Sequence, residues 1–545
     1  MLDFADTITY VHAGHTMKFG GGINYTRDFL FLDAEDPAFA VFPNLNAFLG
    51  KPPFGPTPFA VVFAYRVGPD GARPPAPKGF NRRANQGVAI FDRLSRAHDS
   101  QNFFSLFAQD EWRVTPRLMV NYGLRWDIDH LPKATYETYY KAFQPRLGLA
   151  YNLLPDRVVL RAGAGVYQGV FDLSRILSTR ILGQNPALGP IEPAEYNSYP
   201  GSLFTPQLEG PANAIPAFLN FTHTGIYPTL PGPGLLPAHN FFLTLNRKNP
   251  HGPYTYQWNA QVDCSLTKDM VLSLSYVGVH GLNVYNSYLL NVAPPLFKLP
   301  NGKNDYAIAP SVPAPRVFNR EVSPTAVFFN LDGQSIYHGG TAALTKLFSH
   351  FYSITANYTW SKVIDNTGNG TLSDDPEDPY RRDLERARSK QDVAHRFVAS
   401  FTAEGPEKTW LRNFRFSLIG NVSSPQYYTL YAGFDVNHDG NTLSDRVDLL
   451  ARNTYRGDGL VNFDIRISRL FRLTEHARLE AIAEAFNLFN TLNVTDINTV
   501  YGAANFIGPE PKRFNDKAPA PSPDFGTIRA IASPRQIQFA LRVVF

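Results

Sequence analysis

The sequence has little that points to a disulfide-bonded or a helical membrane protein. It contains a single cysteine, Cys264, so no disulfide can form within the chain, and we interpret this residue as a small hydrophobic side chain. No run of residues approaches the roughly 18 consecutive apolar residues that a transmembrane helix needs. The net charge of +4 over 545 residues gives no reason to expect nucleic acid as a partner.

Catalytic and nucleotide-binding motifs are also missing. The 13 histidines include no H-E-x-x-H pair, and the sequence has no G-x-S-x-G elbow and no phosphate-binding glycine loop. Gly163 and Gly165 fall inside a strand pattern rather than before a helix, so they do not form a dinucleotide site. We therefore expect no enzymatic activity and no bound organic cofactor.

The N-terminus lacks the basic region and apolar core of a signal peptide. A strand pattern begins almost at once, over residues 8–11 and 17–25. This start predicts that the chain begins inside a longer protein, either as an N-terminally incomplete piece or from a wrongly assigned start.

Short turns and long loops alternate along the sequence. The short turns lie near residues 115–117, 154–156, 267–269, 349–350 and 473–475. The long loops, which are polar and rich in proline and glycine, lie near residues 130–142, 170–253, 290–333, 364–393, 424–459 and 490–534. This separation is typical of a transmembrane β-barrel, because every second connection in a barrel lies on the same side of the membrane.

The segments beside the short turns alternate between apolar and polar residues. Leu118, Tyr122 and Trp126 share one face of a predicted strand, whereas Asn121 and Arg125 share the other. Residues 257–266 and 461–468 show the same alternation. In a soluble protein the apolar faces would pack on a second layer, but the segregated loop lengths favour lipid as the covering. A charged content of 18% and an aromatic content of 14% fit a barrel with aromatic girdles.

The last predicted strand ends on an aromatic residue. The four residues Phe539, Leu541, Val543 and Phe545 share its apolar face. The pattern resembles the C-terminal strand by which the outer-membrane assembly machinery recognises its clients, although the final strand of a soluble sheet could end in the same way.

Several segments resemble TonB-dependent receptors. The strand pair FFSLFAQDEWRVTPRLMVNYGLRWD covers residues 103–127, and the next hairpin, FQPRLGLAYNLLPDRVVLRAGAGVY, covers residues 143–167. Residues 253–281, 333–366, 478–494 and 525–545 extend the likeness. Together they are similar to the Oar-like branch, whose members contain a non-catalytic carboxypeptidase-regulatory-like domain. The resemblance implies a signal peptide, a TonB box and a plug before the barrel, and none of these patterns occurs in residues 1–545.

One string resembles a metal-binding loop. Oxygen-bearing side chains alternate with other residues and surround Gly440, as in the first half of a calcium loop. They are Asp435, Asn437, Asp439, Asn441 and Asp445. The twelfth position is Arg446 rather than a bidentate glutamate, and an exposed turn uses the same residue types. Both interpretations stay open.

Two further groups of charges have a functional and a structural interpretation. Residues 378–397 carry Arg381, Arg382, Arg386 and Arg388, which could bind an anion, but mixed signs favour a solvated, salt-bridged loop. A second group faces the predicted lumen, where it could line a substrate path, pair across strands or face a plug. Its members are Asp464, Arg466, Arg478, Glu480 and Glu484.

The sequence therefore predicts an all-β protein, with residues 1–545 forming one antiparallel transmembrane β-barrel domain of the outer membrane. We expect about 14–18 strands, against 22 in a complete receptor barrel. The leading function is uptake of a large, scarce ligand, which we expect the loops near residues 170–253, 290–333 and 490–534 to capture. An ungated pore or a surface-adhesion barrel is the alternative. The expected partners are outer-membrane lipid, the assembly machinery, an unidentified ligand and, through a plug and TonB box, the TonB complex.

Overall fold

The computed structural model describes seven long segments of the chain. They are residues 2–31, 96–131, 137–173, 251–289, 292–307, 327–367 and 376–545, except 440, 442–443, 475–476 and 514–519, together with short strands between them. In the part described, no helix has the length and apolar character needed to cross a membrane.

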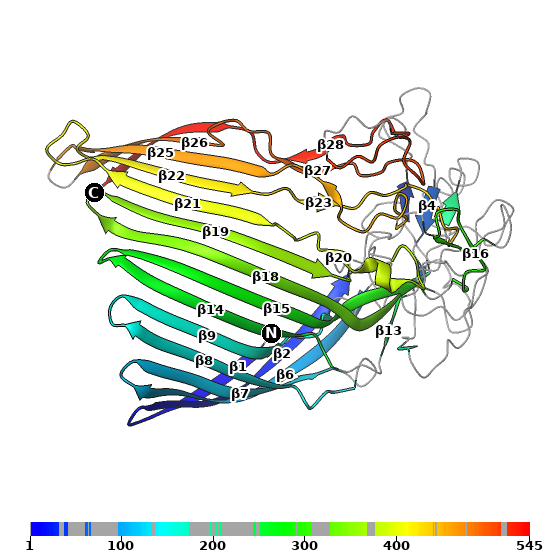
Figure 1. The fold of residues 1–545 in the computed structure, drawn as a ribbon, viewed down its shortest axis with the longest axis horizontal. Helices are drawn as coiled ribbons and strands as arrows, with labels where there is room; N and C mark the ends of the chain where they lie inside the picture. Colours follow the sequence, from blue (N-terminus) through cyan, green and yellow to red (C-terminus); the bar gives the residue numbers. More distant parts are fainter. Residues whose placement is uncertain are drawn as a thin grey trace, which may run out of the picture.

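The described residues form one large sheet of 18 strands. Three of these strands are short pieces, namely β10 (Tyr196–Asn197), β13 (Leu243–Asn246) and β20 (Ala387–Arg388). The remaining long strands are β1 (Leu2–His12), β2 (His15–Phe31), β6 (Arg96–Thr115), β7 (Leu118–His130), β8 (Phe143–Leu154), β9 (Val158–Gln168), β14 (Tyr254–Thr267), β15 (Met270–Leu289), β18 (Val327–Ser349), β19 (Tyr352–Asp365), β21 (His395–Glu404), β22 (Phe414–Ser423), β25 (Leu460–Arg472), β26 (Arg478–Phe486) and β29 (Gln536–Val544). Each long strand pairs antiparallel with the next, as Figure 1 shows. The predicted all-β class and strand number are confirmed.

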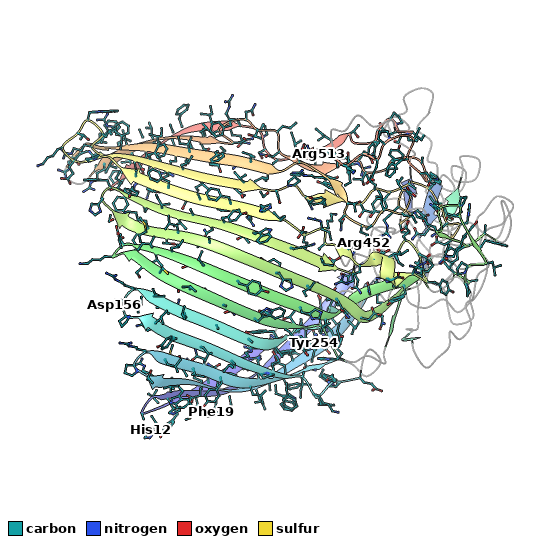
Figure 2. The ribbon with its side chains drawn as sticks, viewed as in Figure 1. His12, Phe19, Asp156, Tyr254, Arg452 and Arg513 are labelled. Atoms are coloured by element: carbon teal, nitrogen blue, oxygen red, sulfur yellow. The ribbon has the colours of Figure 1, made fainter. Side chains whose placement is uncertain are left out.

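Short turns gather at one end of the sheet and long connections at the other (Figure 1). Two-residue turns join β6 to β7, β14 to β15 and β18 to β19. In Figure 2, His12 and Asp156 mark the turn end, whereas Arg452 lies toward the long-loop end. Two connections were missed from sequence: the turn of residues 405–413 and the connection from Phe31 to Arg96.

The strand register gives the sheet one polar and one apolar face. A row of directly paired residues runs Lys18, Gln109, Gly123, Arg146, Gly165 and Gln257 across six strands. The neighbouring row on the opposite face includes Tyr122, Leu147, Ala164 and Trp258. Side chains change face at every residue of a strand, so the pairing carries each pattern across the whole sheet.

The apolar face has no protein layer over it in the part described. Trp360 is 66% exposed and Phe539 is 80% exposed, and both lie within strands of the sheet. Cys264 lies on this face, as expected, in register with Leu272 and Val158. Large apolar side chains exposed along many neighbouring strands indicate a surface that a second phase must cover.

The first and last long strands each have one pairing neighbour among the described residues. β1 pairs with β2, and β29 pairs with β26. No pairing between β1 and β29 is recorded in this part of the chain. The sheet is therefore open along these two edges, which the expected barrel would have to cover or close.

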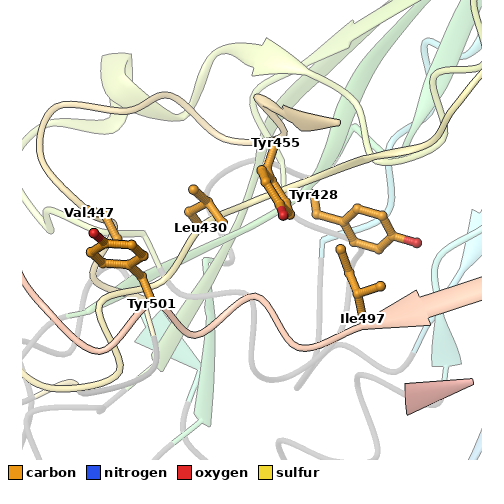
Figure 3. Packing of buried hydrophobic residues seen from close by; sticks show 6 residues of the cluster. All are labelled: Tyr428, Leu430, Val447, Tyr455, Ile497 and Tyr501. Carbon is orange, nitrogen blue, oxygen red and sulfur yellow. The ribbon is translucent and has the colours of Figure 1, made fainter. Parts of the chain in front are cut away.

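A cluster of buried hydrophobic residues lies among the long connections. Figure 3 shows six residues that pack together: Tyr428, Leu430, Val447, Tyr455, Ile497 and Tyr501. The partly buried Phe506 and Phe525 pack against this cluster. They come from the segments between β22 and β25 and between β26 and β29, which also contain the two-stranded sheets β23 (Tyr427–Tyr428) with β24 (Tyr455–Arg456) and β27 (Val494–Ile497) with β28 (Ile528–Ile531). We call this cluster the loop core. It folds these long connections into a compact layer beyond the end of the sheet. We call the described long connections at this end of the sheet the loop layer.

The other short strands also lie in long connections. β3 (Ala38–Val41), β4 (Ala60–Phe63) and β12 (Gln207–Glu209) form a three-stranded sheet. β5 (Tyr65–Arg66) pairs with β11 (Leu203–Phe204), and β16 (Phe297–Lys298) pairs with β17 (Asn304–Asp305).

Candidate functional site

A buried network of charged side chains lies beside the loop core. Arg446 is 3% exposed and pairs with two glutamates: its Nη2 lies 2.6 Å from Glu377 Oε2, and its Nη1 lies 3.0 Å from Glu385 Oε1. Lys303 Nζ lies 2.6 Å from the other Glu377 oxygen, Oε1. Arg452 Nε lies 3.2 Å from Glu385 Oε2. Each glutamate therefore has two cationic partners, which offsets the cost of burying its charge.

The network joins three long connections to the end of a strand. Lys303 comes from the segment between β15 and β18, Glu377 and Glu385 from that between β19 and β21, and the two arginines from that between β22 and β25. Arg452 Nη2 also lies 2.6 Å from Asp365 Oδ1 at the end of β19. These contacts tie the three connections to one another and to the end of β19, and Figure 2 places Arg452 toward that end of the sheet.

The predicted calcium-like residues lie next to this network, in what we call the acidic loop (the described residues of 435–445, that is, all except 440, 442 and 443). Asp439 and Asp445 are 0% and 1% exposed, and Asn437 and Asn441 are also buried. The backbone N–H of Asn441 donates to Asp439 Oδ1 at 2.7 Å, and that of Val436 donates to Asp445 Oδ2 at 2.8 Å. These four side chains are therefore buried, and two of the carboxylates accept hydrogen bonds from backbone groups of the same segment.

Burial and neighbouring negative charges raise the pKa values of two carboxyl groups in the acidic loop. Burial is the larger cause in each case. It raises the pKa of Asp439 to about 7, with a further contribution from the charge of Asp435. It raises the pKa of Asp445 to about 8, with further contributions from the charges of Asp439, Asp435 and Glu377.

Arg446 does not follow the calcium-loop pattern because it has another role. Its guanidinium forms the bridge between Glu377 and Glu385, and its backbone N–H donates to Glu377 Oε1 at 3.1 Å. The sequence showed the departure at this position but gave no signal for the two partners, which lie 69 and 61 residues away.

The four arginines of residues 378–397 lie in separate environments and do not form one cluster. Arg381 pairs with Asp383 at 2.7 Å, and Arg388 pairs with Asp392 at 2.6 Å. Arg382 donates to Asn286 and lies over the ring of Tyr288, 5.0 Å from its centroid. Arg386 takes part in no recorded ion pair within the described residues. The arrangement agrees with a salt-bridged loop more closely than with a single anion site.

The predicted lumen charges lie on the polar face, as expected. Arg466 Nη1 is 3.2 Å from Glu484 Oε1, and Arg466 Nη2 is 3.6 Å from Glu480 Oε1, so these three pair across β25 and β26. Asp464 accepts hydrogen bonds from Asn462 and from the backbone of Asn487. Arg478 stands opposite Arg472 and Val544 in the register.

The polar face is also hollowed near the other edge of the sheet. A depression of about 450 Å³ is lined by residues of both charges and by amides, among them Lys18, Glu111, Arg125, Arg146 and Gln257. The polar face therefore carries charged and amide groups near both edges of the large sheet. A closed barrel would turn this face inward.

The remaining predicted residues belong to the last strand and to the loops. Phe539, Leu541 and Val543 share the apolar face of β29, and Phe545 follows it, all of them exposed. Their role in assembly stays a prediction. Of the predicted capture loops, most of 170–253 lies outside the described residues, as do residues 290–291 and 308–326 of 290–333. Most of 490–534 is described.

Known structures supply distant similarities. A mutant of the ferric enterobactin receptor PfeA from Pseudomonas aeruginosa aligns with a TM-score of 0.47 and 13% identity, covering 99% of this chain and 53% of the receptor. The outer membrane transporter YddB from Escherichia coli aligns with a TM-score of 0.47 and 9% identity, covering 99% and 54%. FpvA from P. aeruginosa, solved with a bound pyoverdine, gives 0.47 and 11%, covering 99% and 47%. The chain thus spans about half the length of these receptors.

The sequence matches a protein family model but no individual curated protein. The family model described as "Outer membrane beta barrel domain" matches residues 1–135, 129–451 and 449–538. These ranges cover nearly the whole chain and include every long strand of the meander except the end of β29. The chain therefore belongs to the outer membrane beta barrel domain family and is a β-barrel protein of the outer membrane.

Proposed function

We propose that the chain is the barrel part of a TonB-dependent transporter of the Oar-like branch, which takes up a large, scarce ligand. The observation that carries the proposal is the folded loop layer at one end of a sheet whose opposite faces are apolar and polar. A folded loop layer supports capture of a ligand because binding residues are commonly carried on loops that a rigid scaffold positions. Long loops on outer-membrane barrels lie on the extracellular side.

In this proposal the ligand first binds to the outer loops. The loop core and the buried Arg446 network keep those loops in one conformation, which lowers the entropy cost of binding. The ligand then passes along the polar face, where Arg466, Glu480 and Glu484 offer charges of both signs. Energy comes from the inner membrane through TonB, a plug and a TonB box. No bond of the ligand is broken, so the protein is not an enzyme.

Growth at limiting nutrient tests this function. A deletion strain of the source bacterium is compared with its parent on candidate nutrients, namely ferric siderophores, oligosaccharides, cobalamin-like compounds and peptides. We expect a growth defect on one class at low concentration that disappears at high concentration. Removing TonB from the parent should produce the same defect.

Two other results would contradict the transporter. An ungated pore would give a large constitutive conductance in planar bilayers and a solute-uptake defect that does not depend on TonB. An adhesion barrel would give a loss of surface attachment with growth unchanged on every nutrient.

A further inference from the structure

We propose that the acidic loop binds a calcium ion, which fastens three long connections of the loop layer to one another. Nothing in this proposal depends on transport, so it can hold or fail independently of the proposed function. The site would use oxygens of Asp435, Asn437, Asp439, Asn441 and Asp445.

The donor set matches the chemistry of calcium. Hard cations of this size take six to eight oxygen ligands from carboxylates, amide carbonyls and backbone carbonyls. The acidic loop offers three carboxylates and two amides within eleven residues, with no sulfur or imidazole donor among the five. His438, the one imidazole in the loop, is exposed and directed to Asp305 Oδ1 at 2.9 Å. Magnesium is less suitable because it demands a small octahedral shell and usually retains several waters.

An unsatisfied oxygen supplies the observation that points to a ligand. Asp445 is 1% exposed, and its Oδ2 accepts from Val436, but its Oδ1 has no hydrogen-bond partner. The buried Oγ of neighbouring Ser444 also has none. A buried carboxyl oxygen without a hydrogen-bond partner is destabilising, and it gains a partner when a cation binds to it.

The surrounding charges explain which kind of ligand would satisfy that oxygen. The charged groups that act most strongly on Asp445 are Asp439, Asp435 and Glu377, and all three are negative. Glu377 is already paired with Arg446 and Lys303, whereas the acidic loop contributes three carboxylates of its own. A divalent cation would balance two of those charges, and an anion would be repelled.

The side chains would move closer together around the ion. No group of three His, Cys, Asp or Glu side chains within the described residues already has metal-ligand spacing. Cation binding would favour the ionised form of Asp439 and Asp445, whose pKa values are raised in the acidic loop. Asn437 and Asn441 are not among the residue types counted there. Their side-chain amides supply neutral oxygens of the kind that calcium sites commonly use.

The position of the acidic loop gives the ion a structural consequence. The backbone oxygen of Asn437 accepts from Tyr306 N at 2.8 Å, and its Nδ2 donates to Glu377 O at 2.7 Å. Asn437 thereby contacts the segments between β15 and β18 and between β19 and β21. An ion that fixes Asn437 would therefore also fix these two connections, next to the Arg446 network.

Calorimetry with the purified protein tests the proposal. The full chain in detergent is treated with EGTA, dialysed, and titrated with CaCl₂ and separately with MgCl₂. We expect saturable calcium binding with a Kd of about 10⁻³ M or tighter, the range of extracellular calcium sites, and much weaker magnesium binding. Asp445→Asn should weaken calcium binding by about tenfold or more, because ligand charge sets the affinity.

The control is Asp458→Asn, an exposed aspartate of the same connection that lies outside the acidic loop. It should bind calcium as the unchanged protein does. Asp439→Asn serves as a second variant if Asp445→Asn fails to give the fast-migrating folded form on unheated gels. Limited proteolysis of residues 424–459 gives an independent readout. Calcium should slow cleavage of the unchanged protein and of Asp458→Asn, but not of Asp445→Asn or Asp439→Asn.

The proposal is overturned if the unchanged protein gives no saturable heat with calcium. It is equally overturned if folded Asp445→Asn or Asp439→Asn binds calcium as tightly as Asp458→Asn.

Discussion

At the scale of the residue, Arg446 organises the loop layer. Its guanidinium is almost fully buried and bridges Glu377 and Glu385. Planar guanidinium groups suit such buried bridges because they make several directed hydrogen bonds and keep their charge. Partners so far apart in the sequence can be found only from the fold, whereas the alternating oxygens of the acidic loop could be recognised locally.

Replacing Arg446 with methionine should loosen the loop layer. The change leaves Glu377 and Glu385 each with one cation instead of two, in a buried setting. Breaking a buried ion pair from one side costs about 3–5 kcal/mol. Hydrogen exchange of residues 424–459 should therefore become much faster.

The matched control for that change is Arg381→Met. Arg381 pairs with Asp383 at an exposed position, where an ion pair contributes about 0–1 kcal/mol. Exchange rates that are equal in the two variants would show that the Arg446 bridge does not hold the layer.

At the scale of the element, the faces of the strands follow from the sequence. Alternation with a period of two is a local property, so Leu118, Tyr122 and Trp126 could be placed on the apolar face before any pairing was known. The hairpin turns at residues 115–117 and 154–156 were likewise predicted correctly. The turn of residues 405–413 was missed because it is longer and contains proline, glycine and charged residues, as the long loops do.

One strand offers a test of its two faces. Leu274 on β15 lies on the apolar face and is 51% exposed, whereas the adjacent Ser275 pairs with Gln261 and Thr341 on the polar face. Leu274→Arg should destabilise the folded barrel by about 2–4 kcal/mol if it lies near the bilayer midplane. Ser275→Arg should change its stability far less, because its side chain meets water. Urea unfolding in lipid vesicles measures both, and a larger loss for Ser275→Arg would reverse the assignment of faces.

At the scale of the whole molecule, architecture could be predicted and the loop layer could not. Segregated loop lengths and alternating strands predict a membrane barrel because both follow from the bilayer as solvent. The loop core brings Tyr428 and Val447 of one connection into the same cluster as Ile497 and Tyr501 of another. No periodic pattern in the sequence indicates such contacts. The same limit applies to the surroundings of the acidic loop, whose motif was visible but whose burial was not.

Lipid contact of the apolar face is the claim on which the account depends. Trp112, Trp126, Trp258 and Trp360 all lie in strands and point to that face, so their fluorescence reports what covers it. The measurement is fluorescence of the protein folded into vesicles whose acyl chains carry bromine, compared with unbrominated vesicles. Trp410, which is 80% exposed outside the strands, is first replaced in a Trp410→Phe variant so that only the four strand tryptophans report. For this variant we predict strong quenching by the brominated chains and weak quenching by iodide in the water. Emission that is unchanged by bromine but quenched by iodide would contradict the account, since it would place water or protein, and not hydrocarbon, against these strands.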